Sequence, residues 1–236
     1  APATVEEAIR LLAEHPDESK LLAGGHSLLP MMKLRFAEPA YLIDINGIPE
    51  LRGVHDDGDS VRIGAMTTEN AIIASDILRE KCPLLPEAAH NISDPQVRNR
   101  GTIGGDIAHG DPANDHPALM LACNASFRLQ GPNGVRMVPA NEFFLGTYWT
   151  ALEAEEVMTE IVIPSFGRGS GYAYCKLKRK QGDWATAASA VVMKLDGDTC
   201  TEVRIGLTNV GPAALYATDA AAELVGKSID EAAIEA

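Results

Sequence analysis

The first 50 residues alternate between short apolar runs and glycine or proline breaks. Apolar positions recur at helical spacing over residues 5–12, directly after a Thr4–Glu7 capping box. Residues 20–23 and 41–45 are short apolar runs typical of strands, and residues 28–34 between them have a helical pattern. This order of strand, helix and strand predicts a small parallel α/β unit.

Beyond residue 50 the apolar period shortens toward two. Residues 51–55 and 60–65 predict one hairpin, and residues 125–130 and 135–138 predict another. Alternation over residues 157–163 predicts an edge strand that Pro164 closes. Helices are expected from Thr67 or Thr68 to Ile77, over residues 84–89 and over residues 118–122. This region is therefore predicted to be α+β.

A stretch rich in Gly and Ser, residues 165–171, is the best candidate for a linker. We therefore expect a first domain over residues 1–166, with subdomains 1–50 and 51–166, and a C-terminal domain over residues 167–236.

The C-terminal domain is predicted to contain an antiparallel pair, residues 187–195 and 200–207, followed by helices from residue 213. The helix-like stretch 228–236 has no stop signal, which indicates that the natural protein continues and that this domain is incomplete.

The charge of the chain argues against two classes of partner. The chain has 20 Lys and Arg residues and 33 Asp and Glu residues. The resulting net charge of −13 repels phosphate backbones and anionic lipid. There is no apolar run of about 18 residues and no export signal at the N-terminus. We expect no nucleic acid partner, no membrane span and a cytoplasmic location.

The four cysteines, Cys82, Cys123, Cys175 and Cys200, are scattered and form no C-x-x-C pair. This spacing disfavours a disulfide framework, a structural zinc site and an iron–sulfur cluster. Redox chemistry on this chain would therefore require an organic cofactor.

Two glycine-rich segments are candidates for phosphate binding: residues 23–27 (Ala-Gly-Gly-His-Ser) and residues 100–106 (Arg-Gly-Thr-Ile-Gly-Gly-Asp). Successive glycines let backbone N–H groups converge on an anion, although one such turn alone is more often ordinary. Two turns fit a pyrophosphate, with the hydroxyls of Ser27 and Thr102 as further hydrogen-bonding groups. The Rossmann and P-loop patterns are missing, so the segments favour a dinucleotide bound in another fold.

Three further features allow more than one interpretation. Residues 109–116 hold two His and two Asp, but their spacing disfavours a metal site. Asp115 can either accept hydrogen bonds from sugar or ribityl hydroxyls or cap a helix. The basic stretch 176–180 is usually a solvated strand face, but it can also anchor a cofactor or dock another subunit, and Trp184 can stack on a planar ring or belong to the core.

Together these segments resemble the FAD-binding medium subunits of molybdenum hydroxylases. The resemblance is carried by residues 23–30, by residues 99–112 and by Arg179-Lys180 with Asp183, and it covers essentially the whole chain. It implies an α+β fold: a two-subdomain FAD-binding domain of the vanillyl-alcohol-oxidase (PCMH) type, then a C-terminal domain with a three-stranded antiparallel sheet plus helices.

The resemblance also implies the FAD contacts. The pyrophosphate would lie between residues 23–27 and 102–105, Ile92 would line the pocket, Asp115 would bind sugar or ribityl hydroxyls, and Met158 would offer backbone contacts to the ring. Lys176 and Trp184 would belong to a third segment against the flavin. The full candidate site, which has no catalytic acid or base and no metal ligand, is Ala23, Gly24, Gly25, His26, Ser27, Ile92, Thr102, Ile103, Gly104, Gly105, Asp106, Asp115, Met158, Lys176 and Trp184.

The function implied by the resemblance is electron transfer in a hetero-oligomer. FAD would receive electrons from [2Fe–2S] clusters on a small subunit, a large subunit would hold the molybdenum cofactor, and a quinone or similar compound would be the external acceptor. The complex would be cytoplasmic or peripheral to the inner membrane, and carbon monoxide is its expected substrate. The alternatives are a self-contained FAD-dependent reductase or oxidase of the same fold type, and a nucleotide-binding module without redox function.

Overall fold

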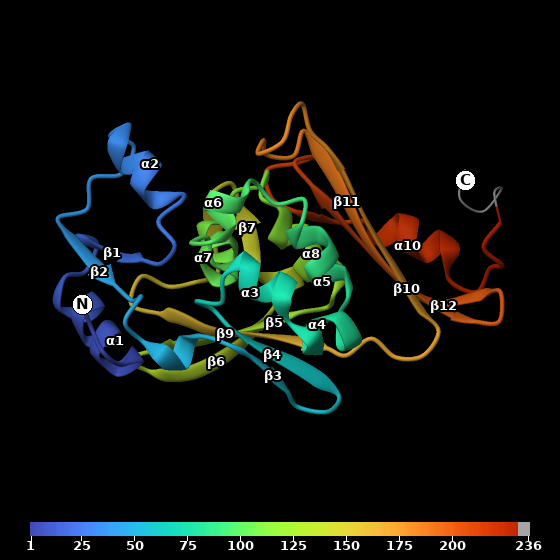
Figure 1. The fold of residues 1–236 in the computed structure, drawn as a ribbon, viewed down its shortest axis with the longest axis horizontal. Coiled ribbons are helices and arrows are strands. Elements are labelled where there is room, and N and C mark those ends of the chain that lie inside the picture. The colour runs from blue at the N-terminus through green and yellow to red at the C-terminus, as the bar shows by residue number, and fades with distance from the viewer. Residues whose placement is uncertain (231–236) are drawn as a thin grey trace.

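The computed structural model describes residues 1–230. Its N-terminal unit is the predicted parallel α/β unit. Helix α1 (Val5–Glu14) begins after Thr4, whose hydroxyl accepts a hydrogen bond from the Glu7 N–H as the capping box predicts. Strands β1 (Ser19–Leu22) and β2 (Tyr41–Asp44) pair in parallel. Helix α2 (Leu28–Lys33), between them, has no buried residue and projects away from the other elements in Figure 1.

The middle of the chain is built on a five-stranded antiparallel sheet of order β3-β4-β9-β5-β6. Both predicted hairpins are present, as β3 (Val54–Asp56) with β4 (Ser60–Gly64) and β5 (Ser126–Gly131) with β6 (Gly134–Pro139). The predicted edge position of β9 (Val157–Pro164) is wrong, because β9 lies between β4 and β5. Its side chains are buried on both faces over most of its length, as in a central strand.

Short helices cover this sheet and bury a continuous apolar core around Phe127 and Phe143. The single helix predicted from residue 67 or 68 to Ile77 is instead two helices, because Ser75 has extended backbone and its hydroxyl caps the second one. The remaining elements of this region are η1 (Pro49–Leu51), α3 (Glu69–Ala74), α4 (Asp76–Lys81), α5 (Leu84–Ala89), α6 (Pro95–Arg98), α7 (Ile103–His109), α8 (Asp115–Ala122), α9 (Ala140–Phe143), β7 (Phe144–Gly146) and β8 (Trp149–Thr150).

The C-terminal part contains the predicted antiparallel pair as β11 (Ala187–Asp196) and β12 (Thr199–Thr208), with β10 (Ser170–Leu177) beside β11. A two-residue strand, β13 (Leu215–Tyr216), extends the sheet where a helix was expected, and α10 (Thr218–Leu224) follows it. The helix expected over residues 228–236 is not present over 228–230, where Ser228 bridges to Thr199; its remaining part lies outside the described residues.

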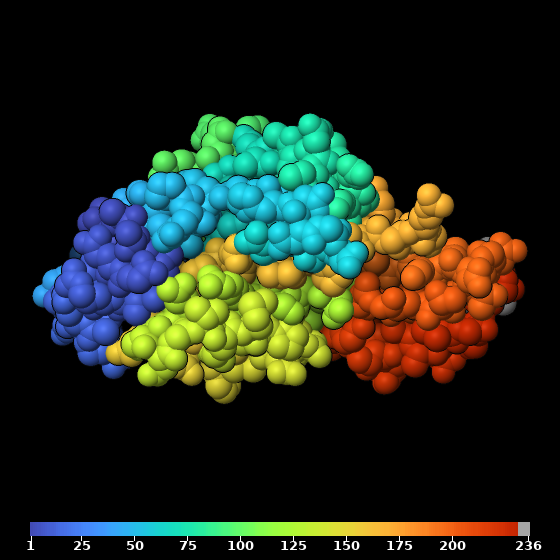
Figure 2. Space-filling model, turned by 90° about the horizontal axis from the view of Figure 1, so that it is seen from below, coloured from blue at the N-terminus to red at the C-terminus, as the bar shows by residue number. Residues whose placement is uncertain are grey.

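The three parts lie in a row, with the N-terminal unit at one end and the long strands β10–β12 at the other (Figures 1 and 2). Gly206 of β12 packs on α8, where a Cβ atom would lie 3.1 Å from the Ala118 Cα.

Residues 165–169, between β9 and β10, belong to no helix or strand, and we propose the domain boundary there. No helix within residues 1–230 is long and apolar enough to span a membrane.

Candidate functional site

A pocket of about 670 Å³ opens where the N-terminal unit, the middle helices and the end of β10 meet. Its volume lies in the range of cofactor pockets. Every predicted site residue except Ile103 lines it, including residues as far apart in sequence as Ala23 and Trp184. Ile103 was placed in the site by its motif, but its side chain is fully buried in the core and its N–H donates to the Thr67 carbonyl at 3.0 Å.

The first glycine-rich turn offers free hydrogen-bond donors to this pocket. Within residues 1–230, the backbone N–H groups of Gly24, Gly25, His26 and Ser27 have no hydrogen-bond partner. Gly25 has φ +81°, a left-handed conformation that favours glycine. The Ser27 hydroxyl makes no capping bond to α2 and also lines the pocket. Consecutive free N–H groups of this kind suit a phosphate anion.

The second turn differs from the first, because most of its donors are already used and, within residues 1–230, only its Thr102 N–H has no hydrogen-bond partner. The N–H groups of Gly104 and Gly105 bond to the Ala65 carbonyl at 2.9 Å and to the Thr102 hydroxyl at 3.3 Å. Its glycines instead permit close packing of backbone: a Cβ atom at Gly104 would lie 2.5 Å from the Ala65 Cβ. The second turn therefore shapes the pocket wall and offers one free N–H group, of Thr102, whereas the first turn supplies four consecutive ones.

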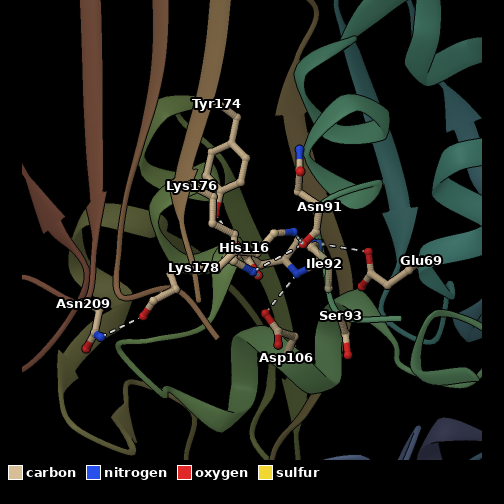
Figure 3. A network of polar contacts seen from close by, with 12 residues as sticks. Glu69, Asn91, Ile92, Ser93, Asp106, His116, Tyr174, Lys176, Lys178 and Asn209 are labelled. Atoms are coloured by element: carbon tan, nitrogen blue, oxygen red, sulfur yellow. Dashed lines mark hydrogen bonds and ion pairs between the residues drawn. The ribbon is translucent and has the colours of Figure 1, made fainter. Parts of the chain in front are cut away.

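Behind the second turn lies a buried ionic network, shown in Figure 3. His116, on α8, has its Nδ1 atom 2.9 Å from Asp106 Oδ2 and its Nε2 atom 3.5 Å from Glu69 Oε2. Burial raises the pKa of Glu69 to about 7, and the positive charge of His116 limits this rise. Glu69 and Asp106 both line the pocket, so the network forms part of its wall.

Asp115 also lines the pocket, and its carboxylate is held by groups from β10. Lys176 Nζ lies 2.8 Å from Asp115 Oδ2, and the Tyr174 hydroxyl donates to Oδ1. Burial raises the pKa of Tyr174 well above its usual range, and the charge of Asp115 adds to this effect. The N-cap of α8 is Asn114, so the interpretation of Asp115 as a helix cap is wrong.

Lys176 is not part of a solvated strand face, because its side chain is only 2% exposed. Its ammonium also donates to the Asn91 carbonyl at 3.4 Å, and Lys178 donates to the same oxygen at 3.3 Å. The next two carbonyls, of Ile92 and Ser93, accept hydrogen bonds from Arg98. The C-terminal strand β10 thereby fixes the loop that carries Ile92 into the pocket.

Met158 reaches the pocket beside an irregularity in the sheet. The pairing of β5 with β9 shifts register between Arg128 and Leu129, so that Leu129 pairs with Met158. A bulge of this kind changes the direction of neighbouring side chains. Met158 is buried and lines the pocket.

Both tryptophans of the chain lie at the mouth of this one pocket. Trp149 is 64% exposed and Trp184 is 65% exposed, which is unusual for so large an apolar side chain. Tyr148, next to Trp149, has φ +56°, and its N–H bonds to the Gly110 carbonyl at 2.9 Å. Sequence reasoning missed Trp149 and Glu69; the rarity of tryptophan was a usable signal for Trp149, whereas nothing in the sequence marked Glu69.

Comparisons with known proteins show the family of the chain. Residues 1–166 match the family described as the FAD binding domain in molybdopterin dehydrogenase, and residues 172–236 match the CO dehydrogenase flavoprotein C-terminal domain. The chain belongs to this flavoprotein family. Its FAD-binding domain has the mixed α+β fold that the sequence predicted.

Known relatives of the flavoprotein match it along most of its length. The carbon monoxide dehydrogenase medium chain of Hydrogenophaga pseudoflava is 61% identical over 236 residues, which are 100% of this chain and 82% of the relative. The nicotine 6-hydroxylase medium subunit of Paenarthrobacter nicotinovorans is 40% identical, over 88% of this chain and 72% of the relative. A solved carbon monoxide dehydrogenase structure from Hydrogenophaga pseudoflava superposes with a TM-score of 0.98 at 62% identity, covering 99% of this chain and 82% of that chain.

FAD fits the residues present in the pocket. The free N–H groups of Gly24–Ser27 suit the diphosphate, and the exposed indoles of Trp149 and Trp184 offer flat apolar faces to a ring system. Among residues 1–230, no group of three or more His, Cys, Asp or Glu side chains could hold a metal ion.

Proposed function

We propose that this flavoprotein is the FAD-carrying medium subunit of a molybdenum hydroxylase. FAD, when bound, supplies the two-electron and one-electron chemistry that links [2Fe–2S] clusters on a partner subunit to an external electron acceptor. The chain itself binds and orients the cofactor. The proposal is supported by its family and by its relatives, which are medium chains of carbon monoxide dehydrogenases and medium subunits of related hydroxylases.

The observation that carries the proposal is that one pocket unites three segments far apart in sequence. The free N–H groups of residues 24–27 face the same space as the wall residues Thr102 and Asp106 and the C-terminal residues Lys176 and Trp184. An ordinary turn would not require this convergence. A dinucleotide requires it, because its phosphates, sugars and rings need different partners.

Small and large subunits complete the proposed complex. We assign the [2Fe–2S] clusters to the small subunit and the molybdenum cofactor to the large subunit. The four cysteines of this chain are free, and three of them are buried, which supports cluster ligands on another chain. The external acceptor is a quinone or similar compound.

Carbon monoxide is the proposed substrate of the complex. The two relatives with 61% and 47% identity are both named carbon monoxide dehydrogenase medium chains, whereas the nicotine 6-hydroxylase subunit is 40% identical. The substrate would react on the large subunit, so no residue of this chain is assigned to the chemistry of carbon monoxide.

The test compares the isolated full-length subunit with the reconstituted complex. We expect the subunit alone to bind FAD without turning over any substrate, and the complex to reduce an acceptor dye when carbon monoxide is supplied. Turnover by the lone subunit would favour the self-contained reductase or oxidase. No FAD binding in either form would favour a nucleotide-binding module and would refute the proposal.

A further inference from the structure

His116 occupies an unusual position between two carboxylates from two different helices. Figure 3 shows its ring between Glu69, from α3, and Asp106, from α7, with a dashed line to each. The imidazole is buried, and it is fixed near the start of α8. Such a contact on both sides leaves the ring little freedom to rotate.

The geometry of these contacts favours a doubly protonated ring. A neutral imidazole carries one N–H group and one nitrogen lone pair. Here both ring nitrogens face carboxyl oxygens, at 2.9 Å and 3.5 Å, so with both carboxyls ionised a neutral ring would direct its lone pair at an anion. Glu69 Oε2 has no hydrogen bond within residues 1–230, which leaves the ring of His116 as its ionic partner. An imidazolium donates a hydrogen bond to Asp106 and at the same time places its positive charge beside Glu69.

The surrounding charges come from five elements. Glu69 on α3, Asp106 on α7 and Asp115 on α8 itself are acidic, and Tyr174 of β10 is a neutral neighbour. Lys176 of β10 is paired with Asp115. Arg98 of α6 influences Glu69, although its guanidinium is hydrogen-bonded to the carbonyls of Ile92 and Ser93. His116 is therefore the cation in direct ionic contact with Glu69 and Asp106.

The negative charge of Asp106 opposes the binding of a diphosphate, because Asp106 directly follows Gly105 and lines the same pocket. Like charges repel strongly where water is excluded. We propose that His116 is a positioning residue for the dinucleotide: its imidazolium holds Asp106 and Glu69 in the pocket wall and offsets their charge where the diphosphate binds. The inference rests on the proposed function, since it takes FAD as the ligand.

The titration of the ring agrees with this role. Burial alone would lower the pKa of His116, but the charge of Glu69 and the hydrogen bond to Asp106 raise it to about 9. The imidazolium is thus the main form at neutral pH and is lost in alkaline solution.

The experiment measures FAD dissociation constants by equilibrium titration of the deflavinated full-length subunit, between about pH 7 and pH 9.5. His116→Asn retains an N–H near the Nδ1 position but not the charge, and we expect it to bind FAD about ten-fold more weakly at neutral pH. The wild type should lose affinity as the pH passes about 9, and the variant should not show this step. His55→Asn is the matched control, because His55 is exposed on β3 and outside the pocket.

A second substitution separates charge from packing. In the double variant His116→Asn/Asp106→Asn the carboxylate that follows Gly105 is also gone, so FAD affinity should return to within about three-fold of the wild-type value. Failure of this rescue, or unchanged affinity in His116→Asn, would overturn the inference. If His116→Asn does not fold, Glu69→Gln keeps the side-chain shape and should move the alkaline step to lower pH, and an unmoved step would likewise overturn it. A wild-type subunit that binds no FAD would instead refute the proposed function.

Discussion

Gly24 of the first glycine-rich segment packs directly against the backbone of Arg100 in the second. A Cβ atom at Gly24 would overlap the Arg100 carbonyl oxygen and would lie 3.0 Å from its carbonyl carbon. The same atom would lie 3.0 Å from the Gly101 Cα. The absence of a side chain at Gly24 thus lets the N-terminal unit approach the middle of the chain and form one pocket between them.

Substitution of Gly24 should therefore act through the fold as well as through the cofactor. Because the obstructing atoms belong to backbone, which cannot rotate away, Gly24→Ala should lower the thermal unfolding midpoint and weaken FAD binding together. Gly167→Ala is the control, since a Cβ atom there meets nothing within 4 Å and the residue has no positive φ. Equal unfolding midpoints for the two variants, measured by calorimetry, would contradict the close approach.

Ser27 and Thr102 should differ in what their hydroxyls stabilise. The Ser27 hydroxyl caps nothing, so Ser27→Ala should leave stability unchanged and cost about 1 kcal/mol of FAD binding, about five-fold in Kd. The Thr102 hydroxyl accepts a hydrogen bond from the Gly105 N–H at the start of α7. Thr102→Ala should therefore also lower the free energy of unfolding by about 1 kcal/mol. Denaturant unfolding and FAD titration of both variants check the contrast, and a loss of stability in Ser27→Ala would refute it.

Local patterns predicted much of the fold because the responsible interactions are local. The capping box at Thr4, both hairpins and the pair β11–β12 depend on turns and periodicity within short segments. The position of β9 could not be predicted, because a strand is central only when distant strands β4 and β5 pair with both of its edges. Ser75 shows the same limit, since a hydroxyl compatible with a helix interior ends one helix and caps the next.

Sequence motifs predicted only part of the candidate site. The glycine-rich segments and the resemblance placed the pocket-lining residues, but the motif could not show that Ile103 turns into the core. It also could not show which N–H groups are free, since those of Ile103 and Gly104 bond to the carbonyls of Thr67 and Ala65 from elsewhere in the chain. The partnership of Glu69 with His116 is a tertiary contact without a sequence signal.

The two tryptophans should report FAD binding by fluorescence. Because both indoles line the pocket mouth and are largely exposed, FAD should quench their emission. Trp149→Phe and Trp184→Phe each leave one indole, so the quenching of the other can be followed separately. Trp149→Ala should weaken FAD binding several-fold, because it removes a flat apolar face. Unquenched emission in Trp184→Phe at saturating FAD would show that Trp149 does not contact the cofactor.

The ionic network should make stability depend on pH with a definite sign. The pKa of His116 is raised from 6.5 to about 9, so its stabilisation is complete below about 6.5 and is lost as the pH rises through about 9. Glu69, whose pKa is raised from 4.5 to about 7, contributes in the same direction at lower pH. The unfolding midpoint of the FAD-free wild type should therefore fall between pH 6.5 and about 9 more steeply than that of His116→Asn. Parallel curves would contradict a charged His116.

The central claim is that the pocket between the two glycine-rich segments holds FAD. The most direct measurement is the flavin content of the complex purified from its native source, with the extracted cofactor identified by mass and quantified against this chain. We predict FAD at about one molecule per chain, retained by the Ser27→Ala complex with lower affinity and lost from the Gly24→Ala complex. A complex that contains this chain in intact form but no FAD, and that takes up none when FAD is added, would contradict the account.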